Sequence, residues 1–298
     1  MSQLIEKINQ GQTLISDGAM GTFLQAMGLE PGQCPEKWNI DQPENVASIA
    51  KAYYDAGSDI CETNSFGGTS YKIKHYFCND TDEQINQKVT LYNQKAAEIA
   101  KSQANEKQLV FGSVGPTGQM IFPLGTEKPE QVYEAFAVQV KALAAGGADA
   151  ICIETMTALE EAELALKAAK DHTTLPVIVT FTFDKGRKGY RSMMGVSVEQ
   201  FVEHFTKAGA DIIGSNCGNG IDNMVEICQL LKQNTDKPIM IQANAGLPVL
   251  ENGKTVFKET PEDMAGKVSQ LIENGAKIIG GCCGTTPEHI KAMKACTA

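Results

Sequence analysis

The chain has 298 residues, of which 42% are hydrophobic and 21% are charged, and its formal net charge is −10. This length supports a large core, either as two modest domains or as one α/β barrel, and the acidic balance argues against nucleic acid as the main partner. No apolar run reaches the roughly 20 residues of a membrane span, and the first residues lack the basic head and apolar stretch of a signal peptide, so we expect a cytoplasmic protein with no membrane partner.

The predicted elements alternate along the chain. Residues 1–12 predict a short helix with a polar face. Eight short apolar segments predict strands buried on both faces, at residues 13–20, 56–63, 108–116, 146–155, 175–183, 208–217, 237–246 and 274–283. Helical patterns lie at residues 128–146, 158–172, 197–209, 221–234 and 260–275. The longest part outside this pattern, residues 63–107, is expected to be an elaborated loop plus a helix.

Local signals support several of these boundaries. Four of the strand segments, at residues 56–63, 146–155, 208–217 and 274–283, contain near their start a Gly followed by a small residue, which fits a left-handed cap at the end of the preceding helix. Helix starts are predicted where a capping residue stands just before a first-turn Pro or Glu. These pairs are Thr126 or Glu127 with Pro129, Ser197 with Glu199, Thr260 with Pro261, and Thr286 with Pro287.

Strand and helix thus alternate eight times, which predicts an α/β protein with a parallel sheet closed into a single (β/α)₈ TIM barrel. We expect residues 1–298 to form this one domain, because no linker or low-complexity segment marks a second. The alternative is a doubly wound open sheet. It is less favoured because no G-x-G-x-x-G motif follows the first strand.

The catalytic groups of such a barrel come from the carboxyl ends of its strands. Cys217 ends the sixth predicted strand, and Cys282 and Cys283 end the eighth. The fold therefore places three thiols at one rim although 65 residues (282 − 217) separate them in sequence. Two acids, Asp17 and Glu154, end the first and fourth strands at the same rim.

Three converging thiolates suit Zn²⁺, and three protein ligands with a fourth position open are typical of catalytic rather than structural zinc. The Cys pair alone also fits two inert core thiols or a redox-active vicinal disulfide. The glycines of "GGCCGTT" fit a phosphate site after the seventh and eighth strands. Cys61 also lies at a strand end, directly before Glu62, and strand alternation turns one of these two toward the interior.

Position alone leaves the roles of the other polar residues open. Asp17 could order a turn, and Glu154 could cap the following helix. Cys152 is expected to lie in the core, and His289 in the first turn of a helix. Four further cysteines are interpreted as structural or incidental, namely Cys34, Cys78, Cys228 and Cys296.

Six motifs occur in order between residues 16 and 290: "SDGAMGT", "ETNSFGG", "CIETM", "SNCG", "NAGLP" and "GGCCGTTPEHI". Together they resemble the homocysteine S-methyltransferase family, and most of all the homocysteine-binding module of its cobalamin-dependent methionine synthase branch. The resemblance implies a (β/α)₈ barrel, one zinc ion, and transfer of a methyl group to L-homocysteine to form methionine.

The resemblance also implies roles for individual residues. Cys217, Cys282 and Cys283 would bind the zinc, and the sulfur of homocysteine would take the open position. Glu154 would lie near the amino group of homocysteine. The substrate would further be held by Asp17 with the backbone of Gly18, Ala19 and Met20, and by Asn216 and Asn244 near the metal.

The methyl donor remains open at this stage. The sequence has no D-x-H-x-x-G motif, which supplies the lower cobalt ligand in the cobalamin module, so we expect a methylcorrinoid to arrive on a separate protein. One alternative is a small donor, S-methylmethionine or a betaine, for which only Trp38, Tyr71 and Tyr76 suggest an aromatic pocket. Another is a subunit that binds zinc and homocysteine without turnover.

Overall fold

The computed structural model describes residues 2–251 and 254–297. Eight parallel strands form one sheet in the order β1-β12-β9-β8-β5-β4-β3-β2. A parallel bridge between Ser16 and Ile60 joins the outermost strands and closes the sheet. The predicted (β/α)₈ barrel is therefore confirmed and the open sheet is excluded. The barrel strands are β1 (Leu14–Ile15), β2 (Ile60–Glu62), β3 (Leu109–Val114), β4 (Ala150–Met156), β5 (Val177–Phe181), β8 (Ile212–Asn216), β9 (Ile239–Ala243) and β12 (Ala276–Gly281).

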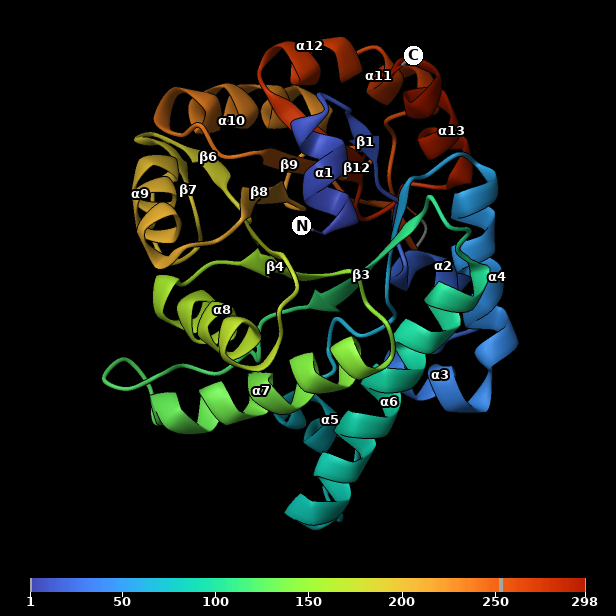
Figure 1. The fold of residues 1–298 in the computed structure, drawn as a ribbon, viewed down its shortest axis with the longest axis vertical. Helices are drawn as coiled ribbons and strands as arrows, with labels where there is room; N and C mark the ends of the chain where they lie inside the picture. The colour runs from blue at the N-terminus through green and yellow to red at the C-terminus, as the bar shows by residue number, and fades with distance from the viewer. Residues whose placement is uncertain (1, 252–253, 298) are drawn as a thin grey trace.

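Helices surround the barrel (Figure 1). They are α4 (Pro43–Asp55), α6 (Asp82–Gln103), α7 (Pro129–Ala145), α8 (Leu159–His172), α9 (Val198–Ala208), α10 (Ile221–Asn234), α11 (Pro261–Ala265), α12 (Val268–Glu273) and α13 (Pro287–Ala295). Ser197 and Thr260 cap α9 and α11 as predicted. The predicted cap of α7 was wrong, because Lys128 occupies that position. None of the described helices is both long and apolar enough to cross a membrane.

The barrel interior has an apolar lower layer. The helix α1 (Gln3–Asn9) covers its amino-terminal end (Figure 1) and inserts Leu4 and Ile8 among inward-facing strand residues such as Phe111 and Met240. Cys152 lies in the same cluster, as expected for a core thiol. Because side chains alternate along a strand, the next inward position lies two residues further toward the carboxyl end. In this chain that next layer is polar.

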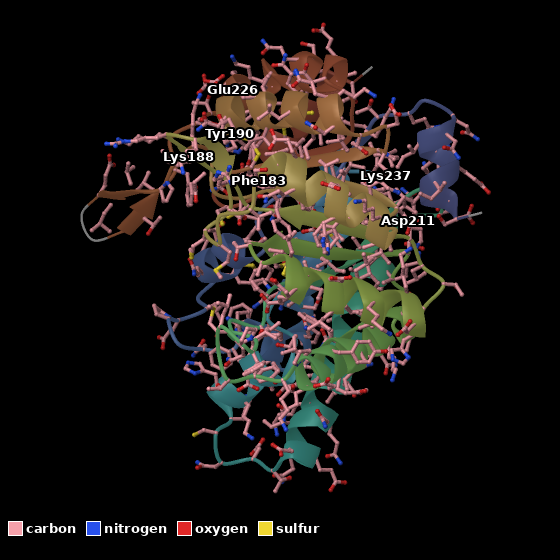
Figure 2. All side chains as sticks on the ribbon, turned by 90° about the vertical axis from the view of Figure 1, so that its left-hand side faces the viewer. Phe183, Lys188, Tyr190, Asp211, Glu226 and Lys237 are labelled. Atoms are coloured by element: carbon pink, nitrogen blue, oxygen red, sulfur yellow. The ribbon has the colours of Figure 1, made fainter. Side chains whose placement is uncertain are left out.

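Two hairpins lie among the connections at the carboxyl-terminal rim, and the sequence predicted neither. They are β6 (Asp184–Gly186) with β7 (Gly189–Arg191), and β10 (Val249–Glu251) with β11 (Lys254–Val256). Figure 2 shows Lys188 and Tyr190 of the first hairpin on the side of the molecule opposite α1. The remaining short elements are α2 (Gly21–Ala26), η1 (Pro35–Lys37), α3 (Trp38–Asp41) and α5 (Ser70–Tyr76). Residues 63–107 thus contain two helices, α5 and α6, where one was predicted.

Candidate functional site

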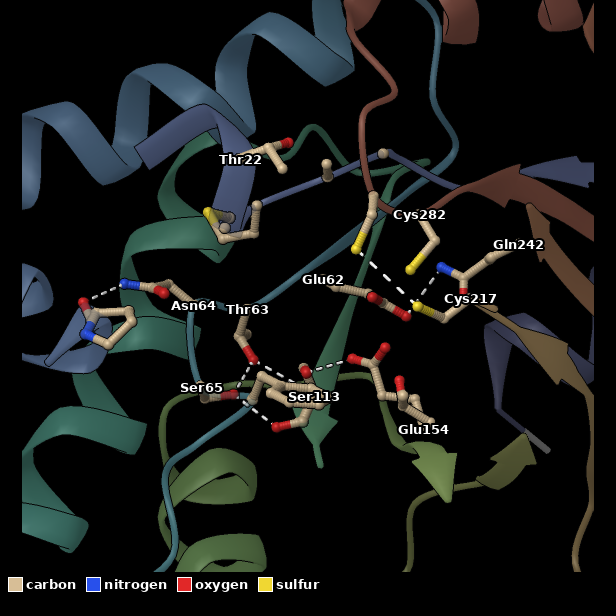
Figure 3. A pocket seen from close by; sticks show the side chains of 18 of the residues that line it. Thr22, Glu62, Thr63, Asn64, Ser65, Ser113, Glu154, Cys217, Gln242 and Cys282 are labelled. Carbon is tan, nitrogen blue, oxygen red and sulfur yellow. Dashed lines mark hydrogen bonds between the residues drawn. The ribbon is translucent and has the colours of Figure 1, made fainter. Parts of the chain in front are cut away.

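The three predicted thiols meet at the rim. Cys217 follows β8, and Cys282 and Cys283 follow β12. Their Sγ atoms all lie within 4.8 Å of one another, and those of Cys217 and Cys283 are 4.0 Å apart (Figure 3). All three are partly exposed and none is in a disulfide. The barrel therefore brings these thiols together, and their binding of zinc stays a prediction.

Backbone contacts between the strand ends hold the thiols in place. Cys217 has a φ of +60°, a left-handed conformation that is uncommon for a residue with a side chain and is typical of functional sites. Its N–H donates to the carbonyl of Gln242 at 3.1 Å, and the N–H of Cys282 donates to the carbonyl of Ala243 at 2.7 Å. The N–H of Cys283 donates to Asn244 Oδ1 at 3.0 Å. Asn244 therefore positions the cysteine pair.

The glycines around the thiols are explained by close packing. A Cβ on Gly18 would come within 2.4 Å of Thr285 Oγ1, and one on Gly281 within 2.3 Å of the same atom. Thr285 also accepts a hydrogen bond from the N–H of Ala19 at 3.1 Å. These glycines let the loop after β1 pack against the loop after β12. Close packing thus explains Gly281 of the "GGCCGTT" segment without the phosphate site that the sequence left open.

The thiols open onto a cavity of about 260 Å³. This volume is at the small end for ligand sites and suits an amino acid rather than a nucleotide or a corrin ring. Among the predicted substrate residues, Gly18, Ala19, Met20 and Glu154 line the cavity. No Lys, Arg or His lies among the described residues of its wall. The carboxyl groups of Glu36, Glu62 and Glu154 in this wall suit a ligand group that carries positive charge.

The aromatic residues considered for a betaine site lie elsewhere. Trp38 is buried and Tyr76 is exposed, and Tyr71 Oη donates to Glu127 Oε2 at 2.8 Å. None of these three residues is part of the cavity wall, where Phe66 is the one aromatic side chain among the described residues. A cage of aromatic faces around a quaternary nitrogen is therefore not present at this cavity in the described part of the chain.

Glu154 is held by neutral donors. Ser113 Oγ donates to Glu154 Oε1, and Asn216 Nδ2 donates to Glu154 Oε2 at 3.2 Å. Burial and the charge of Glu62 raise the pKa of Glu154 well above its usual range. Asn216 Oδ1 also accepts a hydrogen bond from the N–H of Thr155 at 2.8 Å. The side-chain amide of Asn216 therefore forms its hydrogen bonds to neighbouring protein groups. The structure thus places Asn216 as a positioning residue outside the cavity lining.

Asp17 lies behind the wall rather than in it. Its Oδ2 accepts from the N–H of Glu62 at 2.8 Å and from Cys61 Sγ at 3.1 Å. Burial raises the pKa of Asp17 to about 7. These contacts show which of the two residues at the end of β2 faces the barrel interior. Cys61 packs toward the helices and Glu62 faces the cavity.

Glu62 and Gln242 are site residues that the sequence analysis missed. Gln242 Nε2 donates to Glu62 Oε1 at 3.2 Å, and both side chains line the cavity (Figure 3). Burial and the charge of Asp17 raise the pKa of Glu62 to about 8. Each residue lies two positions beyond an apolar inward-facing residue of its strand, Ile60 or Met240. That two-residue spacing is the signal that could have identified them.

The three thiols also form a hydrogen-bonded group. Donation from Cys282 and Cys283 lowers the pKa of Cys217 to about 3, and the Cys217 thiolate raises the pKa of Cys283 to about 12. On metal binding the other two thiols would also lose their protons, and three thiolates are a soft donor set that suits zinc. Elsewhere, burial raises the pKa of both Cys34 and Cys228 to about 12, which fits inert structural thiols.

The raised carboxyl pKa values predict how the stability of the metal-free protein depends on pH. Folding raises the pKa of Asp17 from 3.8 to about 7 and that of Glu62 from 4.5 to about 8. Their protonated forms therefore stabilise the fold in full below about pH 4, and this contribution is lost as the pH rises through about 7 and 8. In the metal-free protein the lowered pKa of Cys217 acts in the opposite direction over this range, so the carboxyl contribution is measured as a difference between variants. Between about pH 5 and about pH 9 we expect the free energy of unfolding in urea to fall by a few kcal/mol more in the wild type than in Glu62→Gln. Parallel curves for the two proteins would contradict the assignment.

Comparisons with known proteins agree on one family. A family model described as homocysteine S-methyltransferase matches residues 14–297. The methionine synthases of Mycobacterium leprae (strain TN) and Mycobacterium tuberculosis (strain ATCC 25618 / H37Rv) are each 30% identical over 311 residues, which cover 100% of this chain and 25% of the relative. The chain thus spans about a quarter of the length of these curated relatives.

A solved structure shares the fold. The crystal structure of the homocysteine methyltransferase MmuM from Escherichia coli, in its metallated form, superposes with a TM-score of 0.81 at 23% sequence identity. The superposition covers 98% of this chain and 99% of that one. At this level of identity the likeness shows the common barrel architecture.

Proposed function

The chain belongs to the homocysteine S-methyltransferase family, and from that premise we propose that it is an enzyme that transfers a methyl group to the sulfur of L-homocysteine and forms methionine. One observation carries this proposal. Three thiols within 4.8 Å of one another form one wall of a small cavity whose described lining has acids and no basic side chain. Such a site suits a metal cation together with a substrate ammonium group.

The donor set fits zinc. Cys217, Cys282 and Cys283 would hold the ion, because thiolates at this separation are the soft ligands that zinc prefers in proteins. Bound zinc would lower the pKa of the substrate thiol, so that the sulfur is a thiolate at neutral pH. A thiolate is the nucleophile that methyl transfer to sulfur requires.

The chain itself supplies binding and orientation. Glu154 would accept a hydrogen bond from the ammonium group of homocysteine, and the backbone of Gly18, Ala19 and Met20 would receive the amino acid from the other wall. Asn216 and Asn244 would keep Glu154 and Cys283 in place through the bonds described above. This fixed geometry reduces the entropy lost in aligning the sulfur with the incoming methyl group.

For the donor, we propose a methylcorrinoid carried on a separate protein. The cavity is too small for a corrin ring, so the methyl group would be presented at the mouth. Exposed apolar side chains stand on three rim segments, namely the loop after β3, the loop after β7, and β10 with the loop that leads into it. These side chains are Met120, Phe122, Leu124, Met193, Met194, Leu247 and Leu250. Exposed apolar side chains on the connections at the carboxyl-terminal end of the strands, the end at which the cavity lies, are candidates for a partner-binding face.

Polar substitutions on this rim test the proposed donor. Phe122 and Leu250 are 69% and 78% exposed, so Phe122→Ser and Leu250→Ser remove apolar surface without opening the core. We expect each variant to slow methyl transfer from a corrinoid protein on the order of tenfold and to leave transfer from free methylcobalamin unchanged. Leu91→Ser on α6, away from the rim, is the matched control. Equal rates with the corrinoid protein in all three variants would contradict a docking role.

We further propose a cytoplasmic location. All nine cysteines are free, and three of them must stay reduced to bind a metal. The cytosol maintains thiols in that state.

A further inference from the structure

Two carboxyl groups lie next to each other in the cavity. Glu154 is buried and Glu62 is half-buried, and in addition to burial the charge of Glu62 contributes to raising the pKa of Glu154. Figure 3 shows both carboxyl groups pointing into the space beneath the cysteines. Their other donors, Gln242, Ser113 and Asn216, are all uncharged. Two adjacent carboxylates without a cation cannot both ionise in a buried site, so the empty pair shares a proton. A positively charged ligand group between the two carboxyl groups would allow both to be ionised.

The amide of Gln242 provides an independent sign of a missing ligand. The side chain is 2% exposed and lines the cavity, and its Nε2 donates to Glu62 Oε1 and to Ser16 Oγ at 3.3 Å. Its Oε1 is buried and has no hydrogen-bond partner among the described residues. A buried acceptor without a donor is costly. An N–H group in the cavity would satisfy it.

We propose that Glu62 and Gln242 complete, with Glu154, a three-acceptor site for the primary ammonium group of homocysteine. A primary ammonium group has three N–H donors and no acceptor, which matches two carboxylates and one amide oxygen. Its single positive charge replaces the shared proton between the glutamates, so the net charge buried at the pair does not change. This inference rests on the proposed function and adds two residues that determine which amino acids the site accepts.

The site should therefore select for a free amino group. 4-Sulfanylbutanoate has the thiol and carboxylate of homocysteine and no amino group, so it tests the ammonium contacts alone. Glu62→Gln keeps the size and one acceptor of the side chain and removes its charge. We expect this variant to bind L-homocysteine about 10- to 100-fold more weakly, which is the usual range for losing one charge-assisted hydrogen bond. Its affinity for 4-sulfanylbutanoate should change by less than about threefold, since no ammonium contact is involved.

The measurement is isothermal titration of the zinc-loaded 298-residue chain with each ligand, alongside the zinc content of each variant. Gln242→Met, which removes the orphan acceptor, should show the same selective loss. Glu161→Gln is the matched control, because Glu161 is a buried carboxyl that accepts from Thr117 outside the cavity wall. It should preserve both affinities.

The outcomes separate this inference from the function on which it rests. Selective loss of homocysteine binding in Glu62→Gln and Gln242→Met supports the three-acceptor site. Equal weakening for both ligands, or no weakening for either, would overturn it while the proposed function stands. If the wild-type protein binds zinc and no homocysteine, the proposed function itself is wrong.

Discussion

Replacing Cys283 with alanine should abolish metal binding and methyl transfer together. The three Sγ atoms lie within 4.8 Å of one another, and removing one leaves two thiols, too few to hold a catalytic zinc ion. Without the metal the substrate thiol keeps its proton at neutral pH. We expect activity to fall on the order of a thousandfold or more, because a bound metal supplies several kcal/mol of stabilisation. Zinc content by atomic absorption and methionine formation are the two measurements.

A matched substitution controls for the loss of a thiol as such. Cys78 is a free, exposed cysteine outside the cavity, so Cys78→Ala should keep full zinc content and full activity. Cys217→Ala and Cys282→Ala should behave like Cys283→Ala. Full activity in any of these three variants would refute the metal assignment. Activity that survives both chelation and the loss of Cys217 would instead support a redox role for the adjacent cysteines.

Replacing Asn216 with alanine should damage both stability and activity. Its Oδ1 accepts from the N–H of Thr155 at 2.8 Å and from Thr180 Oγ1 at 2.7 Å, while its Nδ2 donates to Glu154. The substitution leaves several buried polar groups unsatisfied next to Cys217. We expect the free energy of unfolding to fall by about 3 kcal/mol or more, and kcat/KM for homocysteine to fall with it because Glu154 loses its support.

Urea denaturation of the zinc-loaded protein measures the first effect, and steady-state kinetics under folding conditions the second. Asn234→Ala at the end of α10 is the control, since its side chain is exposed and its one bond is to the carbonyl of Leu230. That variant should change stability by less than about 0.5 kcal/mol. A wild-type denaturation midpoint in Asn216→Ala would contradict the positioning role.

The barrel and the meeting of the thiols were predictable because both follow from a repeated pattern. Eight apolar segments that end in small or polar residues leave few other topologies, and a parallel barrel places every carboxyl end on one face. That rule alone brings Cys217 to Cys282 and Cys283, and the structure confirms the convergence. The rule says nothing of which side chain at a strand end enters the cavity.

Side-chain direction explains the residues that were missed or placed differently. Asp17 and Glu62 both stand at strand ends, yet Asp17 turns behind the wall and Glu62 turns inward. The side chains of Asn216 and Asn244 form hydrogen bonds that hold Glu154 and Cys283, respectively. Such orientations depend on register and on contacts between distant segments, and a single strand does not show them.

The rim hairpins escaped prediction for a different reason. The residues of β6 and the described side chains of β10 are exposed, so neither strand has an apolar face that alternates with a polar one. Periodicity detects burial, and these strands are hardly buried. The turn at residues 187–188 between two glycines was the available signal for the first hairpin.

The most direct test is methionine formation from L-homocysteine by the zinc-loaded protein, with methylcobalamin, S-methylmethionine and betaine supplied in separate reactions. We predict methionine from methylcobalamin and its loss when zinc is chelated. Methionine from S-methylmethionine or betaine alone would uphold transfer to homocysteine and refute the corrinoid donor. A protein that binds zinc and homocysteine yet forms no methionine from any of the three, nor from a methylated corrinoid protein, would contradict the proposed methyl transfer and favour a binding subunit without turnover.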